Sequence, residues 1–191
     1  MSEHGWVCPG ADGDGFVPFR HLKRLAAEMS RDRFVREFPV PALRVVDDVA
    51  LASREPANRV DSGVRLLTET VQSAAILRYL TRVAFITKRP GNPFPHLVSI
   101  GRAATNDIAV RVDSVSKVHG YFVPEGESWS FTDHGSTIGS MINGQVLAAG
   151  EHYPLSDGDR LQLGLEVVLE FLAPESLHRK ARDAAEHGGI T

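Results

Sequence analysis

The chain has 191 residues, of which 42% are hydrophobic, and its formal net charge is -3. This length and apolar content suffice for one or two packed domains. The slight acidity gives no reason to expect a nucleic-acid partner, which would favour a basic face. No apolar run reaches the roughly 18 residues of a membrane span, so no membrane partner is expected.

The amino-terminal residues and the single cysteine fit a cytoplasmic protein. Residues 1–6 lack both the basic region and the following apolar stretch of a secretory signal. Cys8 is the only cysteine, so it forms no internal disulfide and has no second cysteine to complete a zinc site. We expect a free thiol in a flexible, glycine-rich segment over residues 1–18, and neither a metal nor a cofactor.

Residues 19–79 are predicted to be mainly helical. Apolar side chains recur there at helical spacing, beginning with Phe19, Leu22, Leu25 and Met29. Pro39 and Pro41 end this pattern. The apolar stripe should pack on the second domain or on a partner. Residues 64–80 fit either a helix or a strand, and a helix over residues 71–79 is the preferred interpretation.

From residue 80 to residue 174 the hydrophobic period becomes two, and short strands alternate with turns. The candidate strands cover residues 83–87, 96–100, 108–110, 120–123, 128–132, 140–142, 145–147, 152–155, 160–163 and 167–172. Asn143-Gly144 between two of them is a strong hairpin signal, because both residues tolerate positive φ. Many short strands at regular spacing predict an antiparallel β-sandwich.

The predicted fold class is therefore mainly β, an antiparallel sandwich preceded by a mainly helical segment. Residues 175–191 should form a charged, alanine-rich helix and a tail. We expect the sandwich to close its own core, so that a chain beginning near Tyr79 still folds but aggregates more readily.

Several polar residues beside the predicted strands suit an anion-binding site. Arg102 directly follows a strand, and its planar guanidinium matches phosphate oxygens bidentately. Ser116 offers a hydroxyl donor, and Lys117 adds a positive charge. Asn106 and Thr137 supply short polar groups in neighbouring loops. Loops on a rigid β scaffold are a common place for such a site.

Catalytic and calcium-binding interpretations are less favoured. Ser116, His119 and Asp133 suggest a hydrolase triad, but residues 135–139 have the wrong spacing for a nucleophile elbow. Asp157 and Asp159 lie in a short turn that lacks the twelve-residue ligand series of a calcium loop. Residues 1–79 hold no recognisable catalytic constellation, so we do not expect an enzyme.

Five short motifs in order resemble the forkhead-associated (FHA) domain in its bacterial type, with a helical extension before it. The matching segments are Gly101-Arg102, Asn106-Asp107, residues 114–119, residues 133–137 and Asn143-Gly144. The resemblance covers residues 80–174. It implies an eleven-stranded sandwich whose loops converge at one end, and a non-catalytic module that binds phosphothreonine peptides.

The resemblance also implies a role for each matched residue. Arg102 and Ser116 would bind the phosphate, Lys117 would assist, and Thr137 would shape a pocket for the threonine methyl group. Ile138 stands where the family usually has an asparagine that hydrogen-bonds the peptide backbone. The positions implied to support the binding loops are Gly101, Asn106, His119, Gly139 and Asn143.

Two functions follow from these observations. The first is a phosphothreonine-peptide-binding adaptor in Ser/Thr-kinase signalling, with a phosphothreonine-containing protein, such as a kinase or its substrate, as partner. The second is a phospho-independent protein-protein interaction or scaffold module, because Ile138 removes a peptide contact. Binding to phosphorylated and unphosphorylated peptides would discriminate between them.

Overall fold

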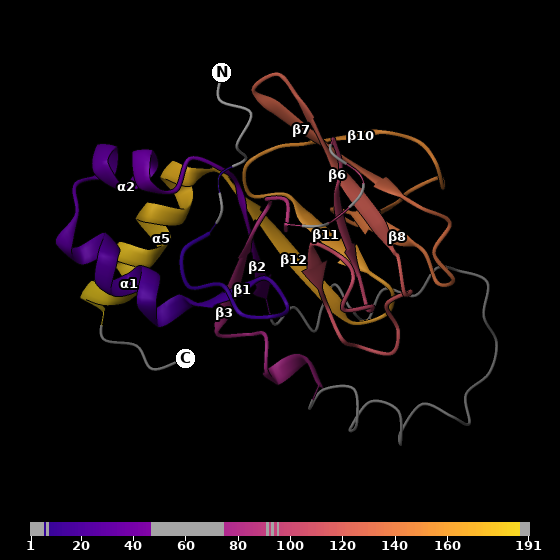
Figure 1. Ribbon diagram of the computed structural model, residues 1–191, viewed down its shortest axis with the longest axis horizontal. Coiled ribbons are helices and arrows are strands. Elements are labelled where there is room, and N and C mark those ends of the chain that lie inside the picture. Colours follow the sequence, from indigo (N-terminus) through magenta and orange to yellow (C-terminus); the bar gives the residue numbers. More distant parts are fainter. Residues whose placement is uncertain are drawn as a thin grey trace.

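The computed structural model describes residues 6, 8–46, 75–90, 92, 94 and 96–187. The described chain forms three layers, with helices on one side, a seven-stranded sheet in the middle and a five-stranded sheet on the other side (Figure 1). The helices of the first layer are α1 (Phe19–Glu28), α2 (Arg31–Glu37) and α5 (Pro174–Glu186). No described helix is long and apolar enough to cross a membrane.

The two sheets form the predicted sandwich. The larger has the order β1 (Phe16–Pro18), β3 (Arg82–Phe85), β2 (Ala42–Val46), β12 (Val167–Leu172), β11 (Arg160–Leu163), β8 (Ser140–Ile142) and β9 (Gln145–Val146). The smaller has the order β10 (Tyr153–Leu155), β7 (Ser128–Asp133), β6 (Gly120–Glu125), β4 (Val98–Gly101) and β5 (Ile108–Ala109). The described strand pairs are antiparallel except β4 with β5. The mainly β prediction is confirmed, and each predicted strand has a counterpart.

The larger sheet buries both of its faces where β2 and β12 lie side by side. Leu43 and Val45 enter the core between the sheets, together with Phe122 of the smaller sheet. Ala42 and Leu172 belong instead to a second core beneath the helices. Successive side chains of a strand point to opposite faces, so a strand covered on both sides is buried throughout, as β12 is, and all of its residues except Glu170 are apolar.

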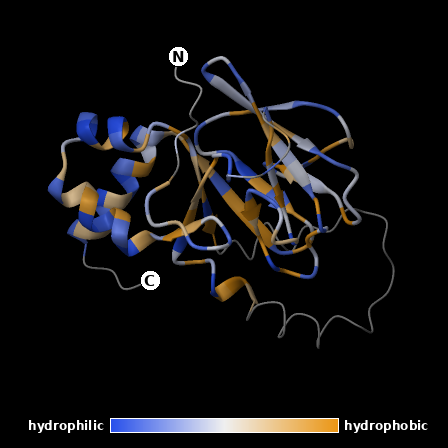
Figure 2. Cartoon of the chain, viewed as in Figure 1, coloured by the Kyte–Doolittle hydropathy of each residue, from blue (hydrophilic) through white to orange (hydrophobic). Residues whose placement is uncertain are grey.

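The helices cover one end of the larger sheet through this second core. The buried side chains of Leu22, Phe34 and Leu177 come from α1, α2 and α5 respectively. The apolar sides of these helices face inward and their charged sides face outward (Figure 2). The predicted packing of the α1 stripe is confirmed. Glu170 of β12 also links the sheet to α5 through ion pairs. Its carboxylate lies 2.9 Å from Arg44 of β2 and 3.0 Å from Lys180 of α5.

Residues 14–18 pack against the sandwich, whereas a flexible segment was predicted for residues 1–18. Asp14 is buried and pairs with Arg111 at 2.5 Å, and its carbonyl accepts a hydrogen bond from Ala109 N in β5 at 2.9 Å. Cys8 is also buried, and burial raises the pKa of its thiol to about 12. We call residues 8–18 the amino-terminal strap. At Gly15 the strap lies so close to the smaller sheet that a Cβ would be 2.7 Å from Asp107 O.

The boundary predicted at residue 80 is wrong, because the preceding segment supplies a central strand. β2 pairs with β12 on one side and with β3 on the other. Arg44 and its β12 partner Glu170 are 126 positions apart in sequence, a separation that no local pattern reports. Residues 75–77 are helical, in agreement with part of the predicted helix, whereas residues 64–74 lie outside the described residues.

A chain shortened to begin at Tyr79 should therefore not form a stable sandwich. Removing β2 separates β3 from β12 and exposes both apolar cores, so we expect the cooperative thermal transition to disappear. Circular dichroism during heating measures this, with a chain that begins at Trp6 as the control. A cooperative transition of the shortened chain at the full-length Tm would contradict the structural assignment of β2.

Candidate functional site

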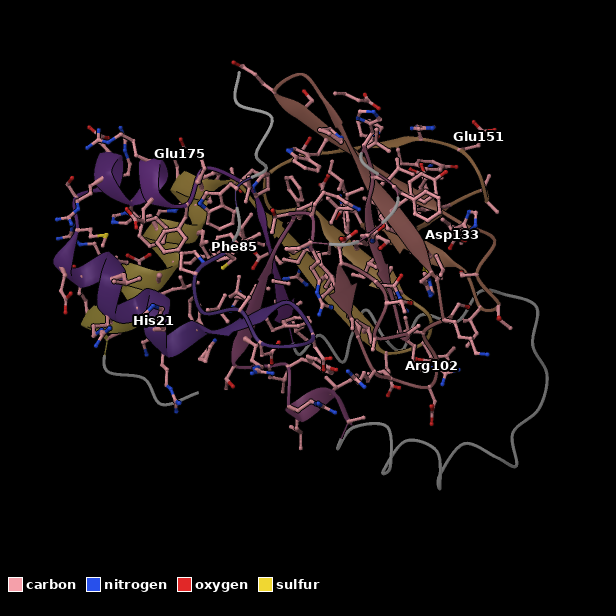
Figure 3. The ribbon with its side chains drawn as sticks, viewed as in Figure 1. His21, Phe85, Arg102, Asp133, Glu151 and Glu175 are labelled. Carbon is pink, nitrogen blue, oxygen red and sulfur yellow. The ribbon has the colours of Figure 1, made fainter. Side chains whose placement is uncertain are left out.

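Three loops meet at one end of the sandwich and hold the predicted anion-binding residues. Arg102 N donates to Ser116 O at 2.8 Å, and Ala103 N donates to Lys117 O at 3.0 Å. These bonds join the loop after β4 to the loop before β6. The loop between β7 and β8 joins them through Thr137, whose amide donates to Ser116 Oγ at 3.0 Å. Arg102 lies at a sandwich end away from the helices, at the lower right of Figure 3.

The backbone orients the Arg102 guanidinium. Its Nε donates to the carbonyl of Val115 at 3.2 Å, and the side chain is 41% exposed. Nη1 lies 3.8 Å from a carboxylate oxygen of Asp113, a side chain that is 92% exposed. Arg102 is thus pre-oriented and accessible, and an arriving anion would compete with Asp113 for it.

Ser116 and Thr137 form a pair of hydroxyls beside Arg102. Ser116 Oγ lies 3.3 Å from Thr137 Oγ1, to which it donates. Thr137 is exposed and Ser116 is half-buried, while Lys117 is exposed next to them in the chain. Because a hydroxyl rotates freely, Ser116 can turn to donate to a phosphate oxygen, and a charge-assisted bond of that kind is stronger than the neutral one.

His119 is a buried link between two of the loops. Its Nδ1 accepts the backbone N–H of Ser116 at 3.1 Å, so the proton of the neutral ring is on Nε2. That nitrogen lies 3.1 Å from Ser140 Oγ and donates to it. Burial lowers the pKa of His119 despite the nearby charge of Asp133, so the ring stays neutral and this single tautomer satisfies both contacts.

The hydrogen-bond chain continues from Ser140 to Asp133. Ser140 Oγ donates to Asp133 Oδ2 at 2.5 Å, and Ser136 donates to the same carboxylate through its amide and its hydroxyl, both at 2.7 Å. Burial alone would raise the pKa of Asp133, but the bonds from Ser140 and Ser136 hold it below its usual range. Asp133 is therefore the ionised anchor of the β7–β8 loop.

This arrangement does not form the triad considered from sequence. Ser116 meets His119 through its backbone amide and not through its hydroxyl. Ser140 lies between the imidazole and the carboxylate of Asp133. The histidine consequently has no free nitrogen with which to activate a nucleophile, and the network orients loops.

Gly101 and Asn106 hold the loop that begins with Arg102. A Cβ on Gly101 would lie 2.5 Å from Lys117 O and 2.9 Å from His119 N, so the close approach of the two backbones requires glycine. The Asn106 side-chain amide donates to Ala103 O at 2.8 Å and to Lys117 O at 2.7 Å. Asn106 thus joins the same two loops from the other side.

Ile138 lies half-buried between Thr137 and Gly139. Gly139 has φ of +101°, a value that disfavours other residues, and its amide donates to Ser136 Oγ at 3.1 Å. Among the described non-glycine residues only Asn143 has positive φ. Ile138 therefore occupies an ordinary backbone region and does not strain the loop.

The resemblance implies that Asn143 supports the binding loops, whereas its side chain contacts the segment that leads into β11. Asn143 and Gly144 have φ of 52° and 84° and form the predicted hairpin turn between β8 and β9. The Asn143 side chain bonds to Asp159 Oδ1 at 2.8 Å and to Arg160 N at 2.9 Å. Asn143 follows the last residue of β8, whereas Ser140 is the first residue of that strand. The side-chain contacts of Asn143 therefore fix the start of β11 and not the Arg102 site.

Sequence reasoning missed three residues of the site. Ser140 completes the His119 chain, and a polar residue at the start of a strand was the available signal. Asp113 faces Arg102 from the neighbouring loop. Glu166 in the β11–β12 turn accepts from Ser114 Oγ at 3.3 Å, and burial, together with the charge of Asp113, raises its pKa. Glu166 and Ser114 are 52 positions apart in the sequence, so sequence spacing gives no indication of their hydrogen bond.

Residues 98–164 match the family model described as FHA domain. No curated protein matches the chain. Similar solved structures include a chain from a structural and functional analysis of phosphothreonine-dependent FHA domain interactions, at 16% identity and TM-score 0.44, covering 70% of this chain and 95% of that one. The FHA domain of an Arabidopsis thaliana hypothetical protein is 24% identical, with TM-score 0.40, and covers 47% and 73% respectively. Mycobacterium tuberculosis EmbR with a low affinity phosphopeptide is 17% identical, with TM-score 0.42, and covers 70% and 24%.

Acidification should destabilise the fold through His119. Its folded pKa lies below the ordinary 6.5, so the unfolded chain takes up the proton first as the pH falls. The neutral ring contributes its full share of the unfolding free energy above pH 6.5. This share is lost as the pH falls through the folded pKa. Urea unfolding at pH 7.5, 6.5 and 5.5 should show this loss in the wild type and a smaller one in His119→Gln.

The exposed His134 provides the matched control for this titration. His134→Gln should keep the wild-type dependence of unfolding free energy on pH. Equal pH dependence in His119→Gln and His134→Gln would show that His119 does not carry the effect.

Proposed function

Because residues 98–164 belong to the FHA domain family, we propose that this protein is a non-catalytic adaptor that binds phosphothreonine peptides. The observation that carries the proposal is the meeting of Arg102, Ser116 and Thr137 on three loops, two joined by backbone hydrogen bonds and the third by the bond from Thr137 N to Ser116 Oγ. Phosphothreonine carries about -1.5 to -2 charges and three acceptor oxygens. A fork of donors from Arg102 and a hydroxyl from Ser116 suit these oxygens.

The binding step requires no chemistry from the protein. The phosphate approaches Arg102 and displaces the exposed Asp113 carboxylate, while Ser116 turns its hydroxyl away from Thr137. Lys117 adds positive charge beside the same loop. Because His119, Asn106 and Asp133 already fix the loops, little backbone ordering accompanies binding, which favours affinity.

The partner we propose is a phosphothreonine-containing protein in Ser/Thr-kinase signalling, either a kinase or its substrate. The phospho-independent interaction module is the second candidate, and Ile138 is the observation that favours it. An aliphatic side chain at this position supplies no hydrogen bond to a peptide backbone. The two candidates differ in whether removal of the phosphate abolishes binding.

Replacing Arg102 by alanine should lower affinity for a phosphothreonine peptide by more than about tenfold, since each charge-assisted bond contributes about 1.5–3 kcal/mol. Arg102→Lys should also bind weakly, because it lacks the planar fork. Calorimetric titration measures both variants. Arg20→Ala, at an exposed position of α1, is the matched control and should bind as the wild type does. Equal affinity of Arg102→Ala and wild type would remove Arg102 from the site.

Ile138→Asn should strengthen binding of a phosphothreonine peptide whose flanking residues are all alanine. A neutral hydrogen bond contributes about 0.5–1.5 kcal/mol, which corresponds to roughly two- to twelvefold. The asparagine amide can pair with the peptide backbone, and the ordinary φ at this position requires no rearrangement. The same titration with the unphosphorylated peptide is the control. A change of equal size for both peptides would favour the phospho-independent module.

A further inference from the structure

Arg89 joins the amino-terminal strap to the loop that begins with Arg102. It lies between β3 and β4, and its guanidinium donates through Nη2 to Gly13 O of the strap at 2.6 Å. Its other terminal nitrogen, Nη1, donates to Asn106 O at 3.0 Å and to Ala104 O at 3.4 Å. One planar side chain therefore holds backbone carbonyls of two segments that are far apart in the sequence.

The backbone of Arg89 is itself fixed by the buried carboxylate of Asp107. Asp107 Oδ1 accepts from Arg89 N at 2.8 Å, and Oδ2 accepts from Lys88 Nζ at 2.9 Å and from Ser99 N at 2.8 Å. Ser99 belongs to β4, so this carboxylate attaches the segment before β4 to the strand. The guanidinium extends from a fixed backbone, which limits the entropy lost in holding its contacts.

The loop that Arg89 contacts is the one that orients the phosphate-binding residues. The buried Asn106 donates through its side chain to Ala103 O and Lys117 O, and so joins the Arg102 loop to the Ser116 loop. Its backbone carbonyl is the acceptor for Arg89. A shift of the Asn106 backbone would move the amide that holds the two loops together, so the contact with Arg89 reaches the site.

The other end of the connection is held in place by the docked strap. The carboxylate of Asp14 lies 2.5 Å from Arg111, and Asp14 O accepts from Ala109 N of β5 at 2.9 Å. These contacts fix the residue that follows Gly13. Docking of the strap therefore places Gly13 O where the guanidinium of Arg89 can donate to it.

We propose that Arg89 is a positioning residue of the candidate phosphate site, and that it makes docking of the strap and binding of a phosphothreonine peptide favour one another. The inference rests on the proposed function. Arg89 acts through the backbone of Asn106, and its contacts are complete only when the strap and the loop are both in place. Such coupling is reciprocal: the factor by which a docked strap strengthens peptide binding is the factor by which bound peptide stabilises the docked strap.

The first test is calorimetric titration of the full chain with a phosphothreonine peptide. Arg89→Gln should lower affinity by roughly two- to twelvefold, because the hydrogen bonds that tie the loop to the strap are lost. Arg89→Lys should also bind weakly, because an ammonium group lacks the planar fork that reaches both backbones. Arg44→Gln is the matched control: it removes a partly buried arginine from its pair with Glu170, which keeps Lys180 as a partner, and should bind as the wild type does.

The second test is hydrogen exchange of the Ala109 amide, followed by NMR. This amide reports docking of the strap, because its acceptor is Asp14 O. A saturating phosphothreonine peptide should slow its exchange in the wild type by a factor comparable to the affinity loss of Arg89→Gln, and should leave it unchanged in that variant. A general loss of stability would raise exchange throughout the chain without removing the response to the peptide.

Wild-type affinity of Arg89→Gln, or an equal loss in Arg44→Gln, would overturn the positioning role. Wild-type affinity of Arg89→Lys would overturn it as well, since the residue would then act through its charge alone. So would an Ala109 exchange rate in the wild type that does not respond to the peptide.

Failure of the proposed function gives a different result, because the wild type would then bind phosphorylated and unphosphorylated peptides equally. The role of Arg89 is still measured in that case, without any peptide, by exchange of the Ala103 amide, which donates to Lys117 O. Faster exchange in Arg89→Gln than in Arg44→Gln would support the connection between Arg89 and the two loops, and equal exchange would contradict it.

Discussion

The neutral, buried imidazole of His119 is the contact on which the candidate site depends. One nitrogen accepts from Ser116 N and the other donates to Ser140 Oγ, so a single ring fixes the Ser116 loop against the start of β8. A protonated ring would have no acceptor for the amide of Ser116. The lowered pKa of His119, caused by burial, and the geometry of the loops are therefore two aspects of one arrangement.

The electrostatics around Arg102 explain how such a site can be selective without being strongly positive. Arg102 and Lys117 supply positive charge, and Asp113 supplies a competing carboxylate 3.8 Å from Arg102. A ligand with a single negative charge gains little by exchanging with Asp113. A phosphate, with greater charge and three oxygens, gains more. The ion pair between Asp113 and Arg102 is exposed to solvent, so breaking it costs an incoming ligand little free energy.

Local patterns in the sequence were sufficient to predict the strands from residue 80 onward and the loops that meet at the candidate site. The period-two segments from residue 80, the Asn143-Gly144 turn and the mostly apolar segment of β12 are properties of short segments, and the structure shows each of them. Arg102, Ser116, Lys117 and Thr137 were identified through ordered motifs, and the structure brings their loops together.

The failures of prediction all involve contacts between distant segments. β2 was not identified because both of its strand partners, β3 and β12, lie far along the chain, and β12 is more than a hundred positions away. The amino-terminal strap has the composition of a loop, yet Asp14 is fixed by Arg111, which lies 97 positions later. Ser140 gains its role through His119, 21 positions earlier, and its only local signal was a polar residue at the start of a strand.

The most direct test of the central claim is to locate a bound phosphothreonine peptide by NMR, using the amide signals of the full chain. The account predicts that the largest shifts fall on the three loops that contain Arg102, Ser116 and Thr137, and that the unphosphorylated peptide produces none of them. Shifts centred on the outer faces of α1, α2 and α5, or equal shifts with both peptides, would contradict it.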